Sequence, residues 1–227
     1  KVFDPQFGVK DLKNKEVKFI GDPDKRIKED YLRILRFLRF SIQYESFDIK
    51  DQVQRSIKIN LNGITKLSKE RIYDELEKII KLKNFYELFK SKFLLHIFKL
   101  IFPEFTYLDR VKKLKKLYND NDFDKNIILA SMLLDFSNNH QYFFHKYNIS
   151  NETKNKLNLY SKILREIKLN KNFFLKDLKK NLFFYGKEDI KKIFIIYNVM
   201  NKKSFNLKSK EMFTKISQVS IPKFPVT

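Results

Sequence analysis

The sequence predicts a mainly α-helical protein with one short β-strand near its start, and three observations support this fold class. The 227 residues include 24 Phe and 11 Tyr, far more aromatic surface than a disordered chain carries. Only four Gly and five Pro interrupt the chain, as is typical of helices joined by short polar loops. From residue 23 onward, apolar residues recur at helical spacing almost to the end.

The first 21 residues have a different pattern from the remainder. Asp4-Pro5 and Gly8 are turn signals, and residues 17–20 have the composition of a short strand that ends at Gly21. A lone strand is not stable by itself, so we expect the sheet that it joins to belong to a longer protein. The sequence ends at residues 221–227 partway through what has the pattern of a longer motif, which supports the same expectation.

Nine helices are expected after this segment. The first, at residues 24–44, has an apolar stripe that includes Ile27, Leu35 and Leu38 opposite a polar face. Asn, Asp and Ser separate the helices and can cap their ends, as in Asn60-Leu61-Asn62-Gly63. The other eight helices are expected at residues 49–59, 68–82, 84–93, 107–118, 126–136, 150–167, 174–183 and 187–200.

The balance of charge indicates a polyanionic partner. Lys and Arg number 48 and Asp and Glu number 27, which gives a net charge of +21. Such an excess favours binding to nucleic acid or to an anionic membrane surface. A composition rich in Lys and Asn also arises in an AT-rich genome, so the charge alone does not identify the partner.

Several kinds of site are disfavoured by what the sequence lacks. With no Cys, the chain has no disulfide framework, no zinc ribbon and no cysteine nucleophile. His140 and His145 would point about 140° apart on a helix, so we expect them to pack and not to share a metal ion. No apolar run approaches the roughly 20 residues of a membrane-spanning helix, and no signal peptide is evident. We therefore expect a cytoplasmic protein that binds no membrane.

Arginines concentrate in the first predicted helix. Four of the eight Arg in the chain, Arg26, Arg33, Arg36 and Arg39, lie within 14 residues. In a chain so rich in Lys, Arg indicates a need for its planar fork, which binds phosphate, carboxylate or a base edge. Asp30 beside Arg33 would place an acceptor next to a donor fork, a combination that matches the edge of a nucleobase. An exposed ion pair that contributes little to stability is the alternative interpretation.

Three motifs carry a resemblance to a known family. The first is D-x-x-x-G-x-x-D-L, with Asp4, Gly8 and Asp11, followed by G-D-P at residues 21–23. The second is E-D-x-x-R at residues 29–33, and the third is E-R-I-x-x-E-L at residues 70–76. Together with I-P-x-F-P-V-T at residues 221–227, they closely resemble the class II CCA-adding enzymes and bacterial poly(A) polymerases. These enzymes are nucleotidyltransferases that act on RNA 3′ ends.

The resemblance implies roles for the residues that match the second motif. Asp30 and Arg33 would recognise the base of incoming CTP or ATP through Watson–Crick-like hydrogen bonds. Arg36 and Arg39 would bind the nucleotide nearer its phosphates.

The resemblance assigns supporting roles to the other motif residues. Glu29 would orient its neighbours, with Arg26 beside it in the motif. The hinge between palm and neck would contain Asp4, Gly8 and Asp11. The neck helix would be braced by Glu70, Arg71 and Glu75.

The chain lacks the family's catalytic motifs. The Gly-Gly or Gly-Ser phosphate-binding turn, which in the family is followed by an Asp-x-Asp pair that holds two Mg²⁺ ions, does not occur in it. We therefore expect no catalytic residue and no metal ligand in this chain. It should be inactive by itself, with Mg²⁺ bound by a head domain that lies outside the sequence.

The resemblance also predicts how function is distributed along the chain. Residues 1–21 would be the end of the palm and the hinge, residues 22–92 a neck that selects the nucleotide and binds RNA, and residues 93–227 a helical body and truncated tail. The body and tail would hold the acceptor and TψC arms of tRNA. The whole enzyme would add CCA to tRNA from CTP and ATP. A poly(A) polymerase of the same family and a non-enzymatic helical RNA-binding module are the alternatives, and the oligomeric state is left open.

Lysine doublets are the candidate RNA contacts of the second half. A-form RNA is recognised through its shape and its phosphates, which lysines can bind without reading sequence. The aromatic residues near these doublets, Phe173, Phe174, Phe183, Phe184 and Tyr185, are interpreted as core residues. The doublets lie at residues 112–113, 115–116, 179–180, 191–192 and 202–203.

Overall fold

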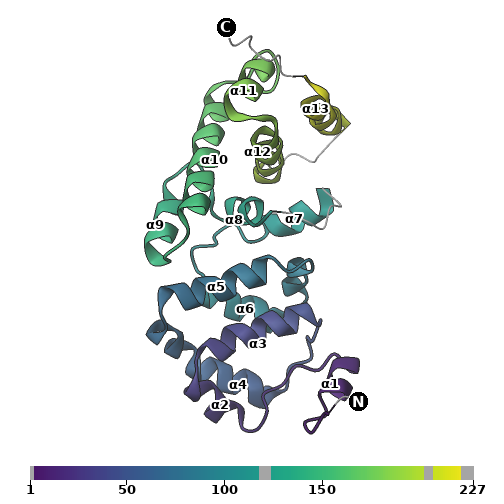
Figure 1. Cartoon of the computed structure of the whole chain (residues 1–227), viewed down its shortest axis with the longest axis vertical. Coiled ribbons are helices and arrows are strands. Elements are labelled where there is room, and N and C mark those ends of the chain that lie inside the picture. The colour runs from purple at the N-terminus through teal and green to yellow at the C-terminus, as the bar shows by residue number, and fades with distance from the viewer. Residues whose placement is uncertain (1–2, 118–123, 202–206, 221–227) are drawn as a thin grey trace. The chain divides into compact units, whose positions relative to one another are not determined.

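The computed structural model describes residues 3–117, 124–201 and 207–220 (Figure 1). Within these ranges the chain forms helices joined by short turns, and no segment is a β-strand. The predicted mainly α fold is therefore confirmed. None of the described helices combines the length and the apolar character that crossing a membrane requires.

The chain divides into two compact units. Unit 1 contains Lys1–Phe105, Asn121–Lys125 and Phe143–Ile149, and unit 2 contains Thr106–Asp120, Asn126–Tyr142 and Ser150–Thr227. Each unit is described by itself below. The predicted assignment of function to residues 1–21, 22–92 and 93–227 stays a prediction.

The predicted strand at residues 17–20 is wrong, since these residues are irregular. A strand needs a partner for its backbone groups, and the described residues offer no second strand. Instead, the Val17 N–H donates to Oγ of Ser46 at 3.1 Å, and the Phe19 ring stacks on Phe37 at 5.2 Å. A short helix that the sequence did not predict, α1 (Gly8–Lys13), precedes this segment.

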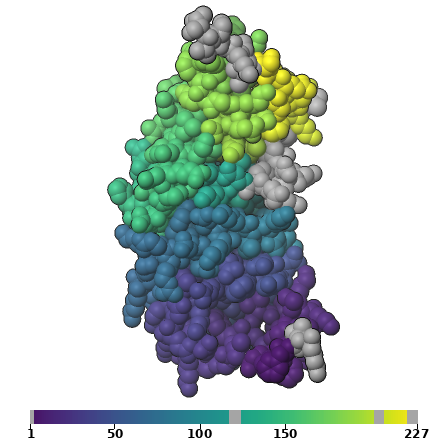
Figure 2. Space-filling view, viewed as in Figure 1, coloured from purple at the N-terminus to yellow at the C-terminus, as the bar shows by residue number. Residues whose placement is uncertain are grey.

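Unit 1 is built on helices that pack in two pairs. Helix α2 (Pro23–Glu29) lies against α4 (Asp51–Asn60), and α3 (Leu32–Gln43) lies against α5 (Lys69–Ile80). In Figure 2 the N-terminal residues gather at one edge of this unit. The other helical elements of unit 1 are η1 (Leu61–Lys66), η2 (Phe85–Lys90) and α6 (Lys92–Ile101).

The helix predicted at residues 24–44 is two helices, so that prediction is wrong at its centre. Asp30 has an extended backbone, with φ −156° and ψ 105°, between α2 and α3. Its Oδ1 accepts a hydrogen bond from the Leu32 N–H at 3.1 Å. A short carboxylate that binds nearby backbone N–H groups competes with the helical ladder, which explains the break.

The predicted apolar stripe survives the break in the helix. Ile27 on α2 and Ile34, Leu35 and Ile42 on α3 have no exposed surface, and Leu38 is 1% exposed. The stripe therefore forms the centre of the core of unit 1, as its helical spacing predicted.

A glycine fixes the geometry of this break. Gly63 in η1 lies so close to Tyr31, the residue after Asp30, that a Cβ at this position would be 2.1 Å from the Tyr31 ring. The ring is also covered by the Lys66 ammonium, 5.7 Å from its centroid. The contact holds the start of α3 against η1.

Unit 2 is built around a long helix. Helix α10 (Asn151–Leu169) buries Tyr160, Ile163 and Leu164 completely and packs against α12 (Lys187–Met200). Arg110 donates from Nη1 to the Leu134 carbonyl at 2.6 Å, so it satisfies a carbonyl at the end of α8 (Lys125–Leu133). The other helices of this unit are α7 (Arg110–Leu117), α11 (Leu178–Tyr185) and α13 (Leu207–Gln218), and α9 (Asn139–Lys146) has only its first four residues in it.

Gly63→Ala should destabilise the protein, because the new methyl group would overlap the Tyr31 ring. Overpacking of this kind costs about 1–3 kcal/mol of unfolding free energy. Denaturant unfolding of Gly63→Ala, Tyr31→Ala and the double variant measures the coupling between the two positions. The double variant should lose less unfolding free energy than the two single variants lose together. Additive losses would show that the contact does not determine the geometry of the break.

Candidate functional site

The structure gathers eight motif residues on three helices of unit 1. We call them the arginine–carboxylate cluster. Five arginines face three carboxylates, so the cluster keeps an excess of positive charge. Its members are Arg26 and Glu29 on α2, Asp30 at the break, Arg33, Arg36 and Arg39 on α3, and Arg71 and Glu75 on α5.

Asp30 is paired with Arg71 and not with Arg33. Nη2 of Arg71 lies 3.1 Å from Oδ1 and 3.0 Å from Oδ2 of Asp30. The sequence placed Arg71 in a brace on the neck helix, and the structure shows that the carboxylate which it contacts is the predicted base-reading residue. Asp30 is partly buried, with 24% of its side chain exposed.

Arg33 is held by the other side of the break. Its Nη1 donates to Oε2 of Glu29 at 2.7 Å and to the Arg26 carbonyl at 2.7 Å. The same Glu29 oxygen accepts from Nη1 of Arg26 at 2.6 Å. The hydrogen bond from Arg33 is the main cause that holds the pKa of Glu29 below its usual value. Glu29 therefore orients both arginines, although half of its side chain is exposed.

Glu75 is the buried charge of the cluster, with only 2% of its side chain exposed. It accepts from Nε of Arg39 at 2.9 Å and from Nζ of Lys78 at 2.9 Å. Burial by itself would raise the pKa of Glu75, but the hydrogen bonds from Lys78 and Arg39 outweigh it and hold the pKa below its usual value. The sequence did not single out Lys78, although its place three residues after Glu75 was a usable signal.

Arg36 and Arg39 differ in how firmly they are held. The Arg39 guanidinium lies over the Phe40 ring, 4.2 Å from its centroid, and the side chain is 18% exposed. Arg36 is 46% exposed, and its closest Glu75 oxygen lies 3.9 Å away. Arg36 is therefore the arginine of α3 that is most open to an anionic ligand.

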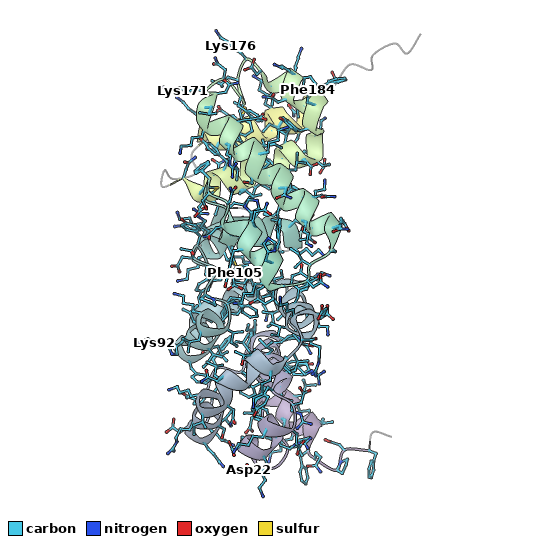
Figure 3. The ribbon with its side chains drawn as sticks, turned by 90° about the vertical axis from the view of Figure 1, so that its left-hand side faces the viewer. Asp22, Lys92, Phe105, Lys171, Lys176 and Phe184 are labelled. Carbon is cyan, nitrogen blue, oxygen red and sulfur yellow. The ribbon has the colours of Figure 1, made fainter. Side chains whose placement is uncertain are left out.

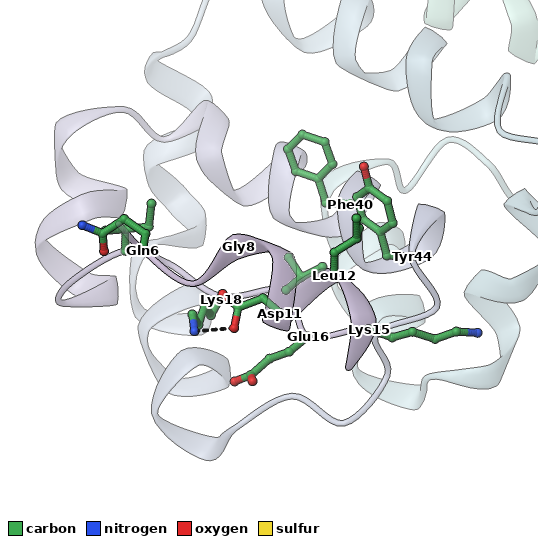
Figure 4. Close-up of a pocket in the computed structure, with 11 residues that line it drawn as sticks. Gln6, Gly8, Asp11, Leu12, Lys15, Glu16, Lys18, Phe40 and Tyr44 are labelled. Atoms are coloured by element: carbon green, nitrogen blue, oxygen red, sulfur yellow. Dashed lines mark hydrogen bonds and ion pairs between the residues drawn. The ribbon is translucent and has the colours of Figure 1, made fainter. Parts of the chain in front are cut away.

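The predicted hinge residues have local structural roles. The Asp4 carboxylate accepts from the Gly8 N–H at 2.7 Å and from the Val9 N–H at 2.8 Å, so it caps the start of α1. Asp11 pairs with Nζ of Lys18 at 2.6 Å (Figure 4). The spacing of the first motif thus has a local explanation, because the aspartate satisfies N–H groups at the first turn of the helix.

An apolar pocket of about 350 Å³ lies beside these hinge residues (Figure 4). Leu12 and Ile20 line it from the N-terminal segment, Phe40 lines it from α3, and Tyr44 lines it from the position directly after α3. Since Phe40 also stacks under Arg39, the pocket and the arginine–carboxylate cluster share one helix.

The other candidate residues lie apart from the cluster. Glu70 accepts from Nδ2 of Asn148 at 3.0 Å, within unit 1. His140 is buried and bonds through Nε2 to Asn158 at 3.1 Å, whereas His145 is exposed. In the described part of the chain, no three His, Cys, Asp or Glu side chains form a group that could hold a metal ion. The last motif, at residues 221–227, and the doublet at residues 202–203 lie outside the described residues.

Comparisons with known proteins agree with these motifs. Residues 46–108 match a family model described as "Probable RNA and SrmB- binding site of polymerase A". A CCA-adding enzyme of Staphylococcus haemolyticus is 31% identical over 197 residues, which is 87% of this chain and 47% of the relative. The mitochondrial CCA tRNA nucleotidyltransferase 1 of Homo sapiens is 44% identical over 81 residues, which is 35% of this chain and 19% of the relative.

The chain belongs to the CCA-adding enzyme and poly(A) polymerase family. This confirms the family that the sequence motifs predicted. A CCA-adding enzyme of Lactobacillus helveticus is also similar, with 42% identity over 72 residues, or 32% of this chain and 18% of the relative. The chain therefore spans less than half the length of these curated CCA-adding relatives.

Glu75→Gln should destabilise this member of the CCA-adding family by about 1.5–3 kcal/mol, because Arg39 loses its charged hydrogen-bonding partner at a mostly buried position. The folded-state pKa of Glu75 is below its usual value of 4.5, so wild type keeps this contribution above about pH 4.5. It loses the contribution as the pH falls through the lowered pKa. Urea unfolding at neutral and acidic pH should show a gap between wild type and variant that narrows in acid.

Glu188→Gln is the matched control for this experiment. Glu188 also pairs with a lysine, Lys191 at 3.0 Å, but 75% of its side chain is exposed. Its replacement should change the unfolding free energy by less than about 1 kcal/mol. A Glu75→Gln variant as stable as this control at neutral pH would contradict the role given to the buried carboxylate.

Proposed function

We propose that this chain is the nucleotide-selecting and RNA-binding part of an enzyme that adds CCA to tRNA from CTP and ATP. Membership of the family supports the reaction class, and the arginine–carboxylate cluster supports nucleotide selection. The observation that carries the proposal is that Asp30 and Arg33 are each fixed by neighbours and still retain hydrogen-bonding capacity of opposite kinds.

Asp30 retains an acceptor for a base. An ionised carboxylate offers about four acceptor positions. The two contacts with Arg71 and the one with the Leu32 N–H account for three of them. The remaining lone pair can accept from an exocyclic amine. Arg71 keeps the carboxylate in place without occupying it completely.

Arg33 retains donors for the same base. Both of its contacts in the described residues, with Glu29 and with the Arg26 carbonyl, use Nη1. The N–H groups on Nη2 and Nε are left to donate to a ring nitrogen or a carbonyl oxygen. Asp30 and Arg33 therefore do not pair with each other and can face a ligand together.

This combination of groups explains a preference for C and A. Cytosine and adenine both present an amine donor beside a ring nitrogen acceptor on the Watson–Crick edge, whereas uracil and guanine present a carbonyl beside an N–H. A carboxylate acceptor next to an arginine donor matches the first pair and opposes the second. One pair of side chains can then serve both CTP and ATP.

The triphosphate would be held by the arginines farther along α3. Arg36 is the more exposed of the two, and its Glu75 contact, at 3.9 Å, is longer than the 2.9 Å contact of Arg39, so we assign it to the phosphates. Arg39 is tied to Glu75 and Phe40, and we assign it to positioning the end of the site.

Mg²⁺ does not fit the residues that the structure describes. Phosphoryl transfer in this family would need carboxylates grouped around the ion, and the described residues contain no such group. We propose that Mg²⁺ is bound by a catalytic head outside these 227 residues. Asp4, Gly8 and Asp11 would form the hinge next to that head.

RNA binding is proposed for both halves of the chain. Residues 46–108 match the RNA-binding model, and exposed lysines of unit 2 would contact the phosphates of the acceptor and TψC arms of tRNA. A cytoplasmic location stays a prediction. A poly(A) polymerase is the second candidate, because the matching model is named for polymerase A.

Asp30→Ala and Arg33→Ala should each reduce the discrimination of CTP from UTP by up to about a hundredfold, since a lost hydrogen bond at such a site costs about 1–3 kcal/mol. Affinities of the 227-residue chain for CTP and UTP, and incorporation of CTP, ATP and UTP by a protein that carries a catalytic head, measure the effect. Arg55→Ala, at an exposed arginine on α4, is the control and should keep the preference.

Each result of this experiment distinguishes between the base-reading role, the non-enzymatic module and the poly(A) polymerase. Unchanged nucleotide preference in both variants would contradict the base-reading role. Binding of tRNA without any nucleotide selection by the wild-type chain, together with no incorporation when a head is present, would favour the non-enzymatic module. Incorporation of ATP alone would favour the poly(A) polymerase.

Binding of tRNA should weaken steeply with salt. Each phosphate neutralised by a lysine contributes about 0.9 log unit of affinity per log unit of salt, taken from duplex DNA. Lys113→Ala with Lys116→Ala, both exposed on α7, should reduce the slope by about 1.8 if each contacts a phosphate. The charge-preserving Lys→Arg pair should restore it. Wild-type affinity that does not change with salt would overturn the phosphate contacts.

A further inference from the structure

The outward face of α11 carries aromatic rings that the core does not use. The sequence interpreted Phe183 and Phe184 as core residues, and this is wrong, because they are 50% and 67% exposed. Phe173 and Phe174, only ten residues earlier, are 2% and 9% exposed. An exposed phenylalanine contributes little to folding, so a pair of them requires another explanation.

Lysines and rings alternate across this face. With Leu178 placed at zero on a helical wheel, Lys179 and Phe183 fall at about 100° and 140°, and Lys180 and Phe184 at about 200° and 240°. Each ring therefore lies one turn beyond a lysine. Both lysines are exposed, and no ion pair in the described part of the chain involves either of them.

The opposite face of α11 fixes the helix firmly in unit 2. Leu178 and Leu182 are buried, and Nδ2 of Asn181 donates to the Phe173 carbonyl at 2.9 Å. The Tyr185 hydroxyl donates to Glu166 on α10 at 2.8 Å. The exposed rings are therefore presented by a rigid helix and not by a loose segment.

The surface continues onto the preceding turn. Lys171 and Lys176 are exposed, and Figure 3 shows them at the same end of unit 2 as Phe184. This turn is ordered by its own hydrogen bonds, including Asn170 Nδ2 to Asp177 at 2.8 Å. Exposed lysines therefore lie on this end of unit 2 beyond those of α11 itself.

We infer that the outward face of α11, formed by Lys179, Lys180, Phe183 and Phe184, binds unpaired nucleotides of the RNA, with the rings stacking on bases and the lysines contacting phosphates. This inference rests on the proposed RNA-binding function. Exposed nucleobases in loops and single strands are bound in this way, because every base has an aromatic face. The rings of Phe183 and Phe184 meet edge to face at 5.6 Å, and 50% of Phe183 and 67% of Phe184 remain exposed in this arrangement.

The arrangement favours RNA over a membrane surface. An interfacial helix lies with a wholly apolar face in the lipid and its charges on the opposite side. On α11 the apolar face is buried in the protein, and rings and lysines share the exposed face. Alternation of rings and cations at one level matches a nucleotide, whose base and phosphate lie side by side.

The test compares two RNAs with the full 227-residue chain. One is a hairpin whose loop contains 2-aminopurine, and the other is a blunt duplex with the sequence of the stem. The Phe183→Ala, Phe184→Ala double variant should bind the hairpin roughly tenfold to a hundredfold more weakly and the duplex about as well as wild type. Fluorescence of 2-aminopurine should change on binding to wild type and not on binding to the variant.

Two further changes separate stacking from charge. Lys179→Ala with Lys180→Ala should reduce the salt slope of hairpin binding by about 1.4, at about 0.7 per phosphate of a single strand. The phenylalanine variant should keep the wild-type slope. Replacing both phenylalanines by tyrosine should restore hairpin binding, because the aromatic faces are kept.

Tyr142→Ala is the matched control. Tyr142 is an aromatic residue of α9 that is 62% exposed and has no lysine one turn before it, so its loss should change neither affinity. All variants are checked by thermal unfolding, and the exposed positions predict unchanged midpoints.

The results that overturn the inference are distinct from those that overturn the proposed function. Hairpin binding unchanged in the double phenylalanine variant, or equal losses on hairpin and duplex, would overturn stacking while RNA binding stands. If the double phenylalanine variant lost binding to anionic phospholipid vesicles but kept its RNA binding, the face would be assigned to a membrane instead. Wild-type chain that binds neither RNA would overturn RNA binding itself, and this inference with it.

Discussion

The carboxylate of Asp30 connects the backbone of unit 1 with its pattern of charge. Its extended conformation ends α2, its bond to the Leu32 N–H begins α3, and its pair with Arg71 ties the break to α5. In an unbroken helix Asp30 would point along the same face as the arginines and its side chain would be free to rotate. The break instead fixes the carboxylate from two sides, and the proposed nucleotide site depends on that restriction.

Glu75 performs a related task farther along α3. A carboxylate that is 2% exposed is tolerated because Arg39 and Lys78 each lie 2.9 Å from it. The same charge holds Arg39 close to the core and leaves Arg36 more exposed. Three arginines at three-residue spacing thus acquire different freedom, although their sequence environment is similar. In the proposed site Arg36 attracts a phosphate and Arg39 positions the end of the site, and the buried glutamate accounts for the difference in freedom between these two arginines.

The sequence predicted which residues form the core of unit 1 better than it predicted the path of the backbone through them. The apolar stripe of Ile27, Leu35 and Leu38 depends only on helical spacing, which is preserved on both sides of the break. The break itself depends on which N–H group the Asp30 side chain binds, and periodicity carries no such information. The partner of Asp30 lies 41 residues away on α5, so local spacing suggested Arg33 instead. The strand at residues 17–20 failed for a different reason, because strand formation requires a partner that the described residues do not contain.

The positions of the exposed phenylalanines carry information that the phenylalanine content of the chain does not. A chain with 24 Phe and an excess of Lys acquires exposed examples of both by compositional bias alone. Among the described residues, however, the exposed phenylalanines are confined to two places, Phe3 and Phe7 in the N-terminal segment and Phe183 and Phe184 on α11. Bias in composition would scatter them over many helices, since every helix has a solvent face. Outside the N-terminal segment, confinement of the exposed phenylalanines to one face of α11 with interleaved lysines is therefore a property of that face and not of the genome's base composition, and it fits the proposed ligand, which is both flat and anionic.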